Sequence, residues 1–231
     1  KYIINWCPRC LTALSNEEVE KTETNGKLWY FRYPLDGGGH IAIATTRPET
    51  ILGDSGVAVH PKDPRYQKMI GRSVLLPLAD RAIPVVGDSA VDPTFGTGAV
   101  KLTPAHDPLD FEIGKRHRLA QLDVMTDDAR LNDTVPKRFR GLDLYVARKA
   151  IIAEFEALGL LDKVVDHQNA VGHCYRCDTV VEPRLSDQWF VKMKPLADKA
   201  FAAFRAGKPR IPPKRWEKVY ENWLLDIRDW C

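Results

Sequence analysis

Alternating apolar and polar positions in the first half of the chain predict β-strands. The segment KLWYFRYPL (27–35) alternates in this way, and HIAIATT (40–46) follows it after the glycine turn DGGGH, so the two predict a hairpin. Shorter apolar runs bounded by proline and glycine predict four further strands, at 56–60, 73–78, 81–86 and 98–103.

Apolar residues in the second half recur at the spacing of helices. Helices are predicted at four segments, namely 107–117, 144–159, 195–206 and 213–230. One face of the second helix is predicted to carry Val146, Ala150, Ile151, Phe155 and Leu158. Gly159 then acts as its stop signal. Strands followed by helices predict a mixed α/β fold around one continuous core.

Three tryptophans near the end of the chain, Trp216, Trp223 and Trp230, recur every seven residues. Such a stripe is typical of a surface that is buried against another part of a protein. We therefore expect the chain to be a piece of a larger protein, cut where it re-enters that protein.

Composition and charge narrow the class of protein. With 231 residues and 44% hydrophobic content, the chain can form one large or two small globular domains. It has no apolar run long enough to span a bilayer and no N-terminal signal pattern, so we expect a cytoplasmic protein with no membrane partner. A net charge of +3 does not by itself indicate a nucleic-acid partner. The basic clusters at 114–118, 136–140 and 207–215 are each typical of a solvated surface.

Four of the five cysteines form two C-x-x-C pairs, CPRC at Cys7 and Cys10 and CYRC at Cys174 and Cys177; the fifth is Cys231. So few cysteines in a chain of this size disfavour a disulfide framework. A thioredoxin-like motif at WCPRC would need a parallel-sheet context. Two pairs favour a structural zinc held by four thiolates, with reduced free thiols as the alternative, because the pairs lie much further apart than in a compact zinc ribbon.

A zinc ion at these cysteines would pin the region near residue 7 to the region near residue 175. That closes a very long loop, for which a cross-link stabilises most in principle. A globule whose two ends lie together is how a domain inserted into another protein is built.

Two segments hold most of the candidate chemistry. ATTRPETILGDSGVAVHP (44–61) and GTGAVKLTPAHDPLDFE (96–112) each place several polar side chains at the end of a predicted strand. The candidates are Thr45, Thr46, Arg47, Glu49, Thr50, Lys101, Thr103, His106, Asp107 and Asp110. No serine or cysteine lies beside the histidine in the second segment, so its chemistry is expected to need no nucleophile of the protein.

Two other interpretations of these segments were weighed. GDSG (53–56) with AHD (105–107) resembles a trypsin-like protease, but there the histidine precedes the serine along the chain. A metal at His106, Asp107 and Asp110 competes with a simpler assignment, in which Asp107 caps a helix and Asp110 lies in solvent. Neither assignment explains why Lys101 and Thr103 share one strand face toward that helix.

The segments TTRPETILGDSGVAVHP and GTGAVKLTPAHDPLDFEIGKRH resemble the two signature segments of the editing domain of valyl-tRNA synthetases. The resemblance covers essentially the whole chain, since NWCPRC with TALSNEEVE is similar to the segment leading into that domain and SDQWFVKMKPLA with WLLDIRDWC to the segment leaving it. Leucyl relatives usually have Asp in place of Glu49, and isoleucyl relatives lack the Arg–Pro–Glu sequence and Lys101. The ATP-binding motifs of a synthetase (HIGH-like and KMSKS-like) do not occur in the chain.

The resemblance implies a strand-rich, barrel-like α/β core with flanking helices. It also implies three segments: 1–25 with the first cysteine pair, 26–165 as the editing core, and 166–231 with the second pair and the helices that return to the catalytic domain. Expected partners are the acceptor end of tRNA(Val), a valine or threonine ester and the rest of the synthetase in cis. The chain is expected to be a monomer, and ATP to bind only in the catalytic domain.

The implied activity is hydrolysis of threonine wrongly esterified to tRNA(Val). An aminoacyl ester is already activated, so hydrolysis needs an aligned water and a stabilised carbonyl oxygen. A hydrophobic synthetic site rejects an isostere with one added hydroxyl only about a hundredfold, a limit for which valyl synthetases are the standard example. A second, polar site is therefore needed to bind the threonine hydroxyl.

Roles carried over from the family are expectations for this sequence. The catalytic set would be Thr45, Arg47, Lys101 and Asp107, and the substrate-binding set Thr46, Glu49, Thr50, Thr103, His106 and Asp110. Asp110 would hold the α-ammonium group. Lys101, Thr103 and Asp107 would surround the threonine side chain and ester, and Thr45, Thr46 and Arg47 would order the water and the terminal adenosine. Thr50 would limit pocket size, and His106 would brace the loop.

Three alternatives remain open from the sequence. The domain could edit as an isoleucyl- or leucyl-type enzyme, the isoleucyl type preferring valyl-tRNA. It could be a tRNA-docking module without activity, which would bind tRNA in a salt-dependent way. It could also be a zinc-pinned structural spacer that neither binds nor hydrolyses.

Overall fold

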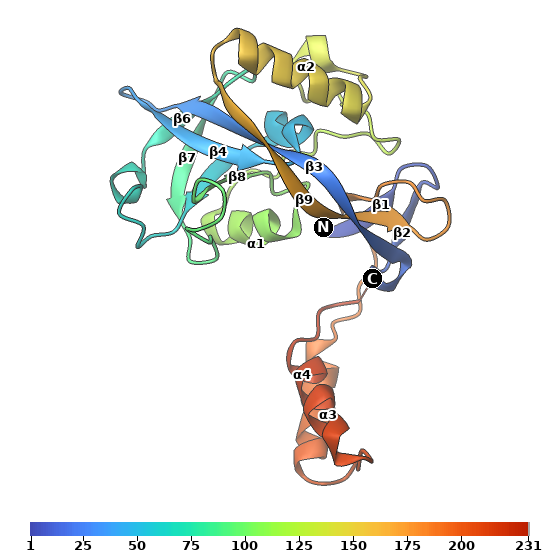
Figure 1. Cartoon of the computed structure of the whole chain (residues 1–231). Coiled ribbons are helices and arrows are strands. Elements are labelled where there is room, and N and C mark those ends of the chain that lie inside the picture. Colours follow the sequence, from blue (N-terminus) through green and yellow to red (C-terminus); the bar gives the residue numbers. More distant parts are fainter. Residues whose placement is uncertain (231) are drawn as a thin grey trace. The chain divides into compact units, whose positions relative to one another are not determined.

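A long antiparallel pair of strands organises the larger part of the chain. In the computed structural model, which describes residues 1–230, β3 (Val19–Pro34) pairs with β9 (Leu161–Cys174) over nearly its whole length. Figure 1 shows the two strands side by side as a twisted ribbon. The sequence predicts only residues 27–35 of this pair, because most of the other residues are at least partly exposed and carry no alternating apolar pattern.

The described strands form three sheets. The first has the order β4-β3-β9, the second β6-β7-β5-β8 and the third β10-β1-β2, and all pairs are antiparallel except β5 with β7. The remaining strands are β1 (Tyr2–Cys7), β2 (Thr12–Leu14), β4 (His40–Thr45), β5 (Gly56–Val59), β6 (Ser73–Leu76), β7 (Arg81–Gly87), β8 (Ala99–Leu102) and β10 (Glu182–Ser186). All six predicted strands are confirmed, and β1, β2, β9 and β10 are additions. The mixed α/β fold is confirmed, although the described sheets do not close into a barrel.

The four predicted helices are also confirmed, as α1 (Pro108–His117), α2 (Leu144–Ala157), α3 (Lys194–Arg205) and α4 (Glu217–Leu225). In Figure 1, α2 lies above the strands and α1 below them. The fourth helix is shorter than predicted, because prolines and a 3₁₀ turn, Lys214–Trp216, precede it. None of the helices within residues 1–230 is both long and apolar enough to cross a membrane.

The chain divides into two compact units, Tyr2–Ser186 and a smaller one that contains Lys1 and the residues from Asp187 onward. The smaller unit consists mainly of α3 and α4. Its tryptophans Trp216, Trp223 and Trp230 stay about half exposed, at 48%, 54% and 50%.

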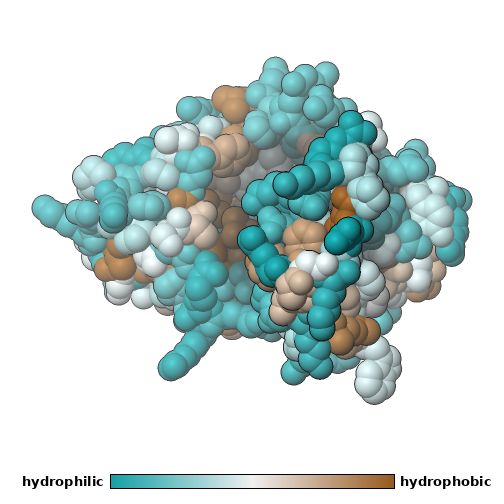
Figure 2. Space-filling model, turned by 90° about the horizontal axis from the view of Figure 1, so that it is seen from below, coloured by the Kyte–Doolittle hydropathy of each residue, from teal (hydrophilic) through white to brown (hydrophobic). Residues whose placement is uncertain are grey.

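Figure 2 shows hydrophilic side chains over most of one face of the molecule, with apolar patches scattered among them. The predicted boundaries after residues 25 and 165 fall inside β3 and β9, and the division of roles among those segments stays a prediction.

One core joins the first two sheets to α2. The buried stripe of α2 consists of Leu144, Ala147, Ile151 and Phe155, and the Phe155 ring lies 4.5 Å from that of Phe31 on β3. The predicted face was wrong at its two ends, because Val146 and Leu158 are 53% and 58% exposed. Helical spacing alone cannot choose between two neighbouring stripes when both contain apolar residues; the position of the strands decides.

This packing predicts a difference in stability between two substitutions in α2. Phe155→Ala should lower the free energy of unfolding by about 3–5 kcal/mol, because it leaves a cavity against β3. Val146→Ala should change it by less than about 0.5 kcal/mol, because this side chain already contacts solvent. Urea unfolding of both variants measures the difference, and equal losses would show that the buried stripe is assigned incorrectly.

Candidate functional site

Lys101 is a lysine on the core-facing side of a strand. It lies opposite Val57 in the antiparallel pair of β5 and β8, and Val57 belongs to the main core. Opposite residues share a face, so the Lys101 side chain points inward and the residue is only 7% exposed. Burying an ammonium costs several kcal/mol unless it is paired and hydrogen-bonded. Its Nζ donates to Asp54 Oδ1 at 3.0 Å, to Thr50 Oγ1 at 2.8 Å and to the Thr103 hydroxyl.

Asp54 is the centre of this group of contacts. It is fully buried and also accepts hydrogen bonds from Tyr33 Oη at 2.7 Å and Thr103 Oγ1 at 2.6 Å. Burial raises the pKa of Asp54, while Lys101 and the two hydroxyls oppose that rise. We call Lys101, Asp54, Thr50, Thr103 and Tyr33 the Lys101 cluster. Asp54 is not among the candidate residues predicted from the sequence, although it lies in the GDSG segment and a buried lysine requires a carboxylate.

Two aspartates lie at the start of α1. Asp107 caps the helix, as expected, since its Oδ1 accepts the backbone N–H groups of Leu109 and Asp110 at 2.8 and 3.0 Å. The alternative assignment, in which Asp110 lies in solvent, is wrong: Asp110 is 6% exposed, and its Oδ2 accepts the Thr103 N–H at 2.8 Å. Burial, together with the charge of Asp107, raises the pKa of Asp110 to about 7. Among the described residues, nothing hydrogen-bonds to Asp110 Oδ1.

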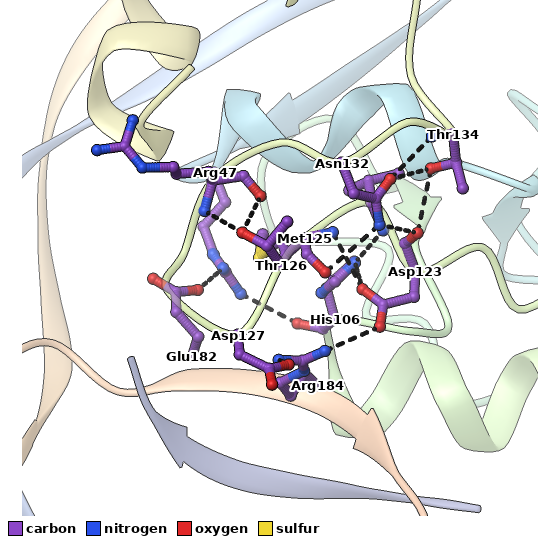
Figure 3. Close-up of polar contacts among 12 residues, drawn as sticks. Arg47, His106, Asp123, Met125, Thr126, Asp127, Asn132, Thr134, Glu182 and Arg184 are labelled. Atoms are coloured by element: carbon purple, nitrogen blue, oxygen red, sulfur yellow. Dashed lines mark hydrogen bonds and ion pairs between the residues drawn. The ribbon is translucent and has the colours of Figure 1, made fainter. Parts of the chain in front are cut away.

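Arg47 connects the strand end of β4 to distant parts of the chain. Its guanidinium donates to Glu49 Oε1 at 3.2 Å. It also donates to the His106 carbonyl at 3.0 Å and to Glu182 (Figure 3). Glu49, 2% exposed, also accepts two hydrogen bonds from Arg148, at 2.7 and 3.0 Å. We call Arg47, Glu49, Arg148 and Glu182 the Arg47 cluster. Burial alone would lower the pKa of Arg47, but Glu182 and Glu49 raise it, so the guanidinium is charged.

Thr50 joins the two clusters. Its hydroxyl donates to the Arg47 carbonyl at 3.0 Å and accepts from Lys101. Thr45 accepts the Arg47 N–H at 3.0 Å and so fixes the backbone after β4. The two segments with most of the candidate residues, 44–61 and 96–112, therefore meet in one buried polar region. Thr46 is half-buried and shows no hydrogen bond to either cluster among the described residues.

His106 is buried and braces a neighbouring loop. It is 1% exposed, and its Nε2 accepts the Val124 N–H at 3.0 Å. Burial, together with the charge of Arg47, lowers the pKa of His106 to about 3, so the ring is neutral and can accept this bond. The loop is further held by Asn132 Nδ2, which donates to the Asp123 carbonyl at 2.9 Å (Figure 3).

The turn before β8 requires glycine. Gly96 and Gly98 have φ angles of 59° and 79°, which L-residues rarely adopt. A Cβ at Gly98 would lie 2.8 Å from the Pro93 carbonyl oxygen. The turn therefore brings β8, and with it Lys101, to the position that the cluster needs.

The two cysteine pairs lie together in the structure. The Sγ atoms of Cys7, Cys10, Cys174 and Cys177 are all within 4.8 Å of one another, and those of Cys7 and Cys177 are 3.4 Å apart. A tetrahedral zinc with Zn–S bonds of about 2.3 Å separates its sulfurs by about 3.8 Å, so four thiolates placed in this way could hold the ion. Hydrogen bonds from Thr179 lower the pKa of Cys177 to about 6, which favours the thiolate. Cys231 lies outside the described residues.

Glu182, Arg148 and Asp54 are the residues that sequence reasoning missed. Arg148 and Glu182 lie 99 and 135 residues along the chain from their partners Glu49 and Arg47. The sequence around these residues contains no pattern that predicts those contacts. The two long strands β3 and β9, with α2 before β9, bring them together.

Comparisons with known proteins identify the family of the chain. The family described as tRNA synthetases class I (I, L, M and V) matches residues 1–231. Valine–tRNA ligase of Carboxydothermus hydrogenoformans is 59% identical over 231 residues, which are 100% of this chain and 26% of that protein. The ligase of Thermotoga maritima is 56% identical, over 100% of this chain and 27% of that protein. The chain thus spans about a quarter of the length of these relatives.

A likeness to a solved structure was also found. The ternary complex of Agrobacterium radiobacter K84 agnB2 LeuRS–tRNA–LeuAMS matches 69% of this chain and 24% of that chain, with 21% identity and a TM-score of 0.47.

The raised pKa of Asp110 predicts a pH-dependent gain in stability for Asp110→Asn. The folded state favours the neutral acid, so the parent chain loses stability as pH rises from the ordinary value of 3.8 to about 7. Asparagine keeps an acceptor for the Thr103 N–H and carries no charge. Its free energy of unfolding should exceed that of the parent by on the order of 1 kcal/mol at about pH 8 and equal it below about pH 4.

Urea unfolding at both pH values measures this gain. The control is Asp198→Asn, which removes an exposed carboxylate from α3 and should have little effect at either pH. A gain of the same size at both pH values, or none at about pH 8, would contradict the assignment.

Proposed function

Because the chain belongs to the family of class I tRNA synthetases, we propose that its buried polar region hydrolyses threonine wrongly esterified to tRNA(Val), as the editing site of a valine–tRNA ligase. The names of its relatives support the valine context. Charging of tRNA with ATP is assigned to the rest of the synthetase, which acts in cis.

Asp110 is the observation on which the proposal depends. Its carboxylate is buried, one oxygen is held by the Thr103 N–H, and the other bonds to no described group. A buried carboxylate with a free oxygen suits the α-ammonium group of an aminoacyl ester, because a charged partner repays the cost of its burial. With a pKa of about 7 in the absence of substrate, Asp110 ionises fully when the ammonium binds.

The neighbouring groups suit ester hydrolysis by water. A water oxygen attacks the ester carbonyl carbon, the bond to the ribose oxygen breaks, and that oxygen leaves with a proton, which yields free threonine and tRNA. Asp107 uses only Oδ1 for the helix cap, so Oδ2 is available to orient the water and take its proton. Arg47 and Lys101 supply positive charge for the carbonyl oxygen and the terminal adenosine.

Selection of threonine over valine is assigned to the hydroxyl groups of Thr50 and Thr103 with Lys101. These groups lie in a fixed hydrogen-bonded network, so a threonine hydroxyl finds donors and acceptors already placed. A valine methyl in the same position can form no hydrogen bond with these groups, so valine lacks this contribution to binding.

We assign a structural zinc to the four-cysteine cluster of Cys7, Cys10, Cys174 and Cys177. The ion would supply no step of the hydrolysis, since four protein ligands leave no open position. Its role is to hold together the first hairpin and the end of β9.

The proposal predicts selective deacylation of threonyl-tRNA(Val). The chain should release threonine from this ester at least about a hundredfold faster than valine from valyl-tRNA(Val), and Asp110→Ala should remove most of the activity. Release of radiolabelled amino acid measures both rates. Binding of tRNA(Val) without cleavage of either ester would refute the hydrolytic role, and faster cleavage of valyl esters would indicate an isoleucyl-type site.

The zinc assignment predicts one tightly bound zinc ion per chain, measured by elemental analysis after gel filtration. Cys174→Ser should lose the ion and unfold at a lower urea concentration, because structural zinc contributes directly to folding. Cys231→Ser is the matched control and should keep it, since it leaves all four ligands in place. Zinc-free protein of unchanged stability would overturn the assignment.

A further inference from the structure

Glu182 reaches the candidate site from a part of the chain that neither site segment contains. It is the first residue of β10 and lies opposite Trp6 in the pairing with β1. It is 8% exposed, and its carboxylate accepts a hydrogen bond from the Arg47 guanidinium. Trp6, which directly precedes Cys7, therefore pairs with Glu182, which accepts the hydrogen bond from Arg47.

The residue next to Glu182 lies among the cysteines. Val181 packs in one buried cluster with Cys7, Cys174 and Leu14, and its N–H donates to the Gly172 carbonyl at 2.9 Å. Successive residues of an extended segment point to opposite sides. One short segment thus places Val181 against the cysteines and Glu182 against Arg47.

Charge balance makes Glu182 necessary to Arg47. The Arg47 cluster contains two guanidinium groups, Arg47 and Arg148, and two carboxylates, Glu49 and Glu182. Arg148 already takes both oxygens of Glu49. Without Glu182, two cations would share one carboxylate in a largely buried position, and Arg47 would keep only a shared carboxylate and the His106 carbonyl.

We propose that Glu182 is a positioning residue for Arg47, and that the four-cysteine cluster holds β10 in the place from which Glu182 makes this contact. The inference rests on the proposed function in that Arg47 acts on the ester and the terminal adenosine. Metal binding at the cysteines is then coupled to the position of the Arg47 side chain in the hydrolytic site. The coupling passes through the adjacent residues Val181 and Glu182, although the ion itself touches no substrate.

A double-mutant cycle tests the positioning role. Glu182→Gln, which keeps the size of the side chain and removes its charge, should lower kcat/KM for threonyl-tRNA(Val) about tenfold in the parent background. In an Arg47→Ala background it should cause no further loss, because its effect passes through Arg47. Equal losses in both backgrounds would show a general structural effect and overturn the proposal. Asp88→Asn is the matched control: it removes another buried carboxylate paired with an arginine, Arg116, and should leave the rate unchanged.

Metal affinity tests the coupling without any measurement of activity. Coupling between two sites is reciprocal, so Glu182→Gln should weaken zinc binding by about fivefold or more in competition with a chromophoric chelator, whereas Asp88→Asn should not. Unchanged affinity would overturn the link between the cysteines and Glu182. If the chain hydrolyses no ester, the proposed function fails, yet the zinc competition still decides whether β10 couples the two regions.

Discussion

The pairing of β3 with β9 is the constraint on which the rest of the larger unit depends. From Val19 opposite Cys174 to Tyr30 opposite Lys163, two segments more than a hundred residues apart are held in one register, and an irregularity then sets Phe31 opposite Leu161. At one end this pairing holds Cys174, one of the four clustered cysteines, opposite Val19, and at the other it brings Phe31 against Phe155 of α2. A slip of one residue would turn each side chain to the opposite face, so cysteine cluster and core depend on the same alignment.

The candidate site consists largely of charged side chains. They can be buried because each lies next to a side chain of opposite charge. Lys101 is neutralised by Asp54, and the two arginines of the Arg47 cluster by Glu49 and Glu182. Paired charges of this kind add little net stability over a well-packed apolar core, but their geometry is rigid. Asp110 is the exception, because it forms no ion pair among the described residues and only one of its oxygens accepts a hydrogen bond there, from the Thr103 N–H. Among the described residues, the charged pairs thus leave Asp110 as a buried carboxylate without a cationic partner.

Under the proposed hydrolysis of an ester, this arrangement would explain why a site without a nucleophile needs so extensive a framework. Water and an activated ester react readily once they are aligned, so most of what the protein can contribute is placement. Placement to within a fraction of an ångström demands that each polar side chain be held by a second contact. Thr50 shows this most directly, since one hydroxyl holds the Arg47 backbone and accepts from Lys101.

The sequence by itself determined the local elements and indicated most residues of the candidate site. Six strands, four helices and the Asp107 cap follow from short-range patterns, because each depends on backbone geometry and neighbouring side chains. Only the tertiary structure decided which stripe of α2 is buried, that Asp110 is hidden from solvent, and that Asp54, Arg148 and Glu182 complete the site. These depend on contacts between residues far apart in the chain, and one sequence carries no local signal for the distance between them.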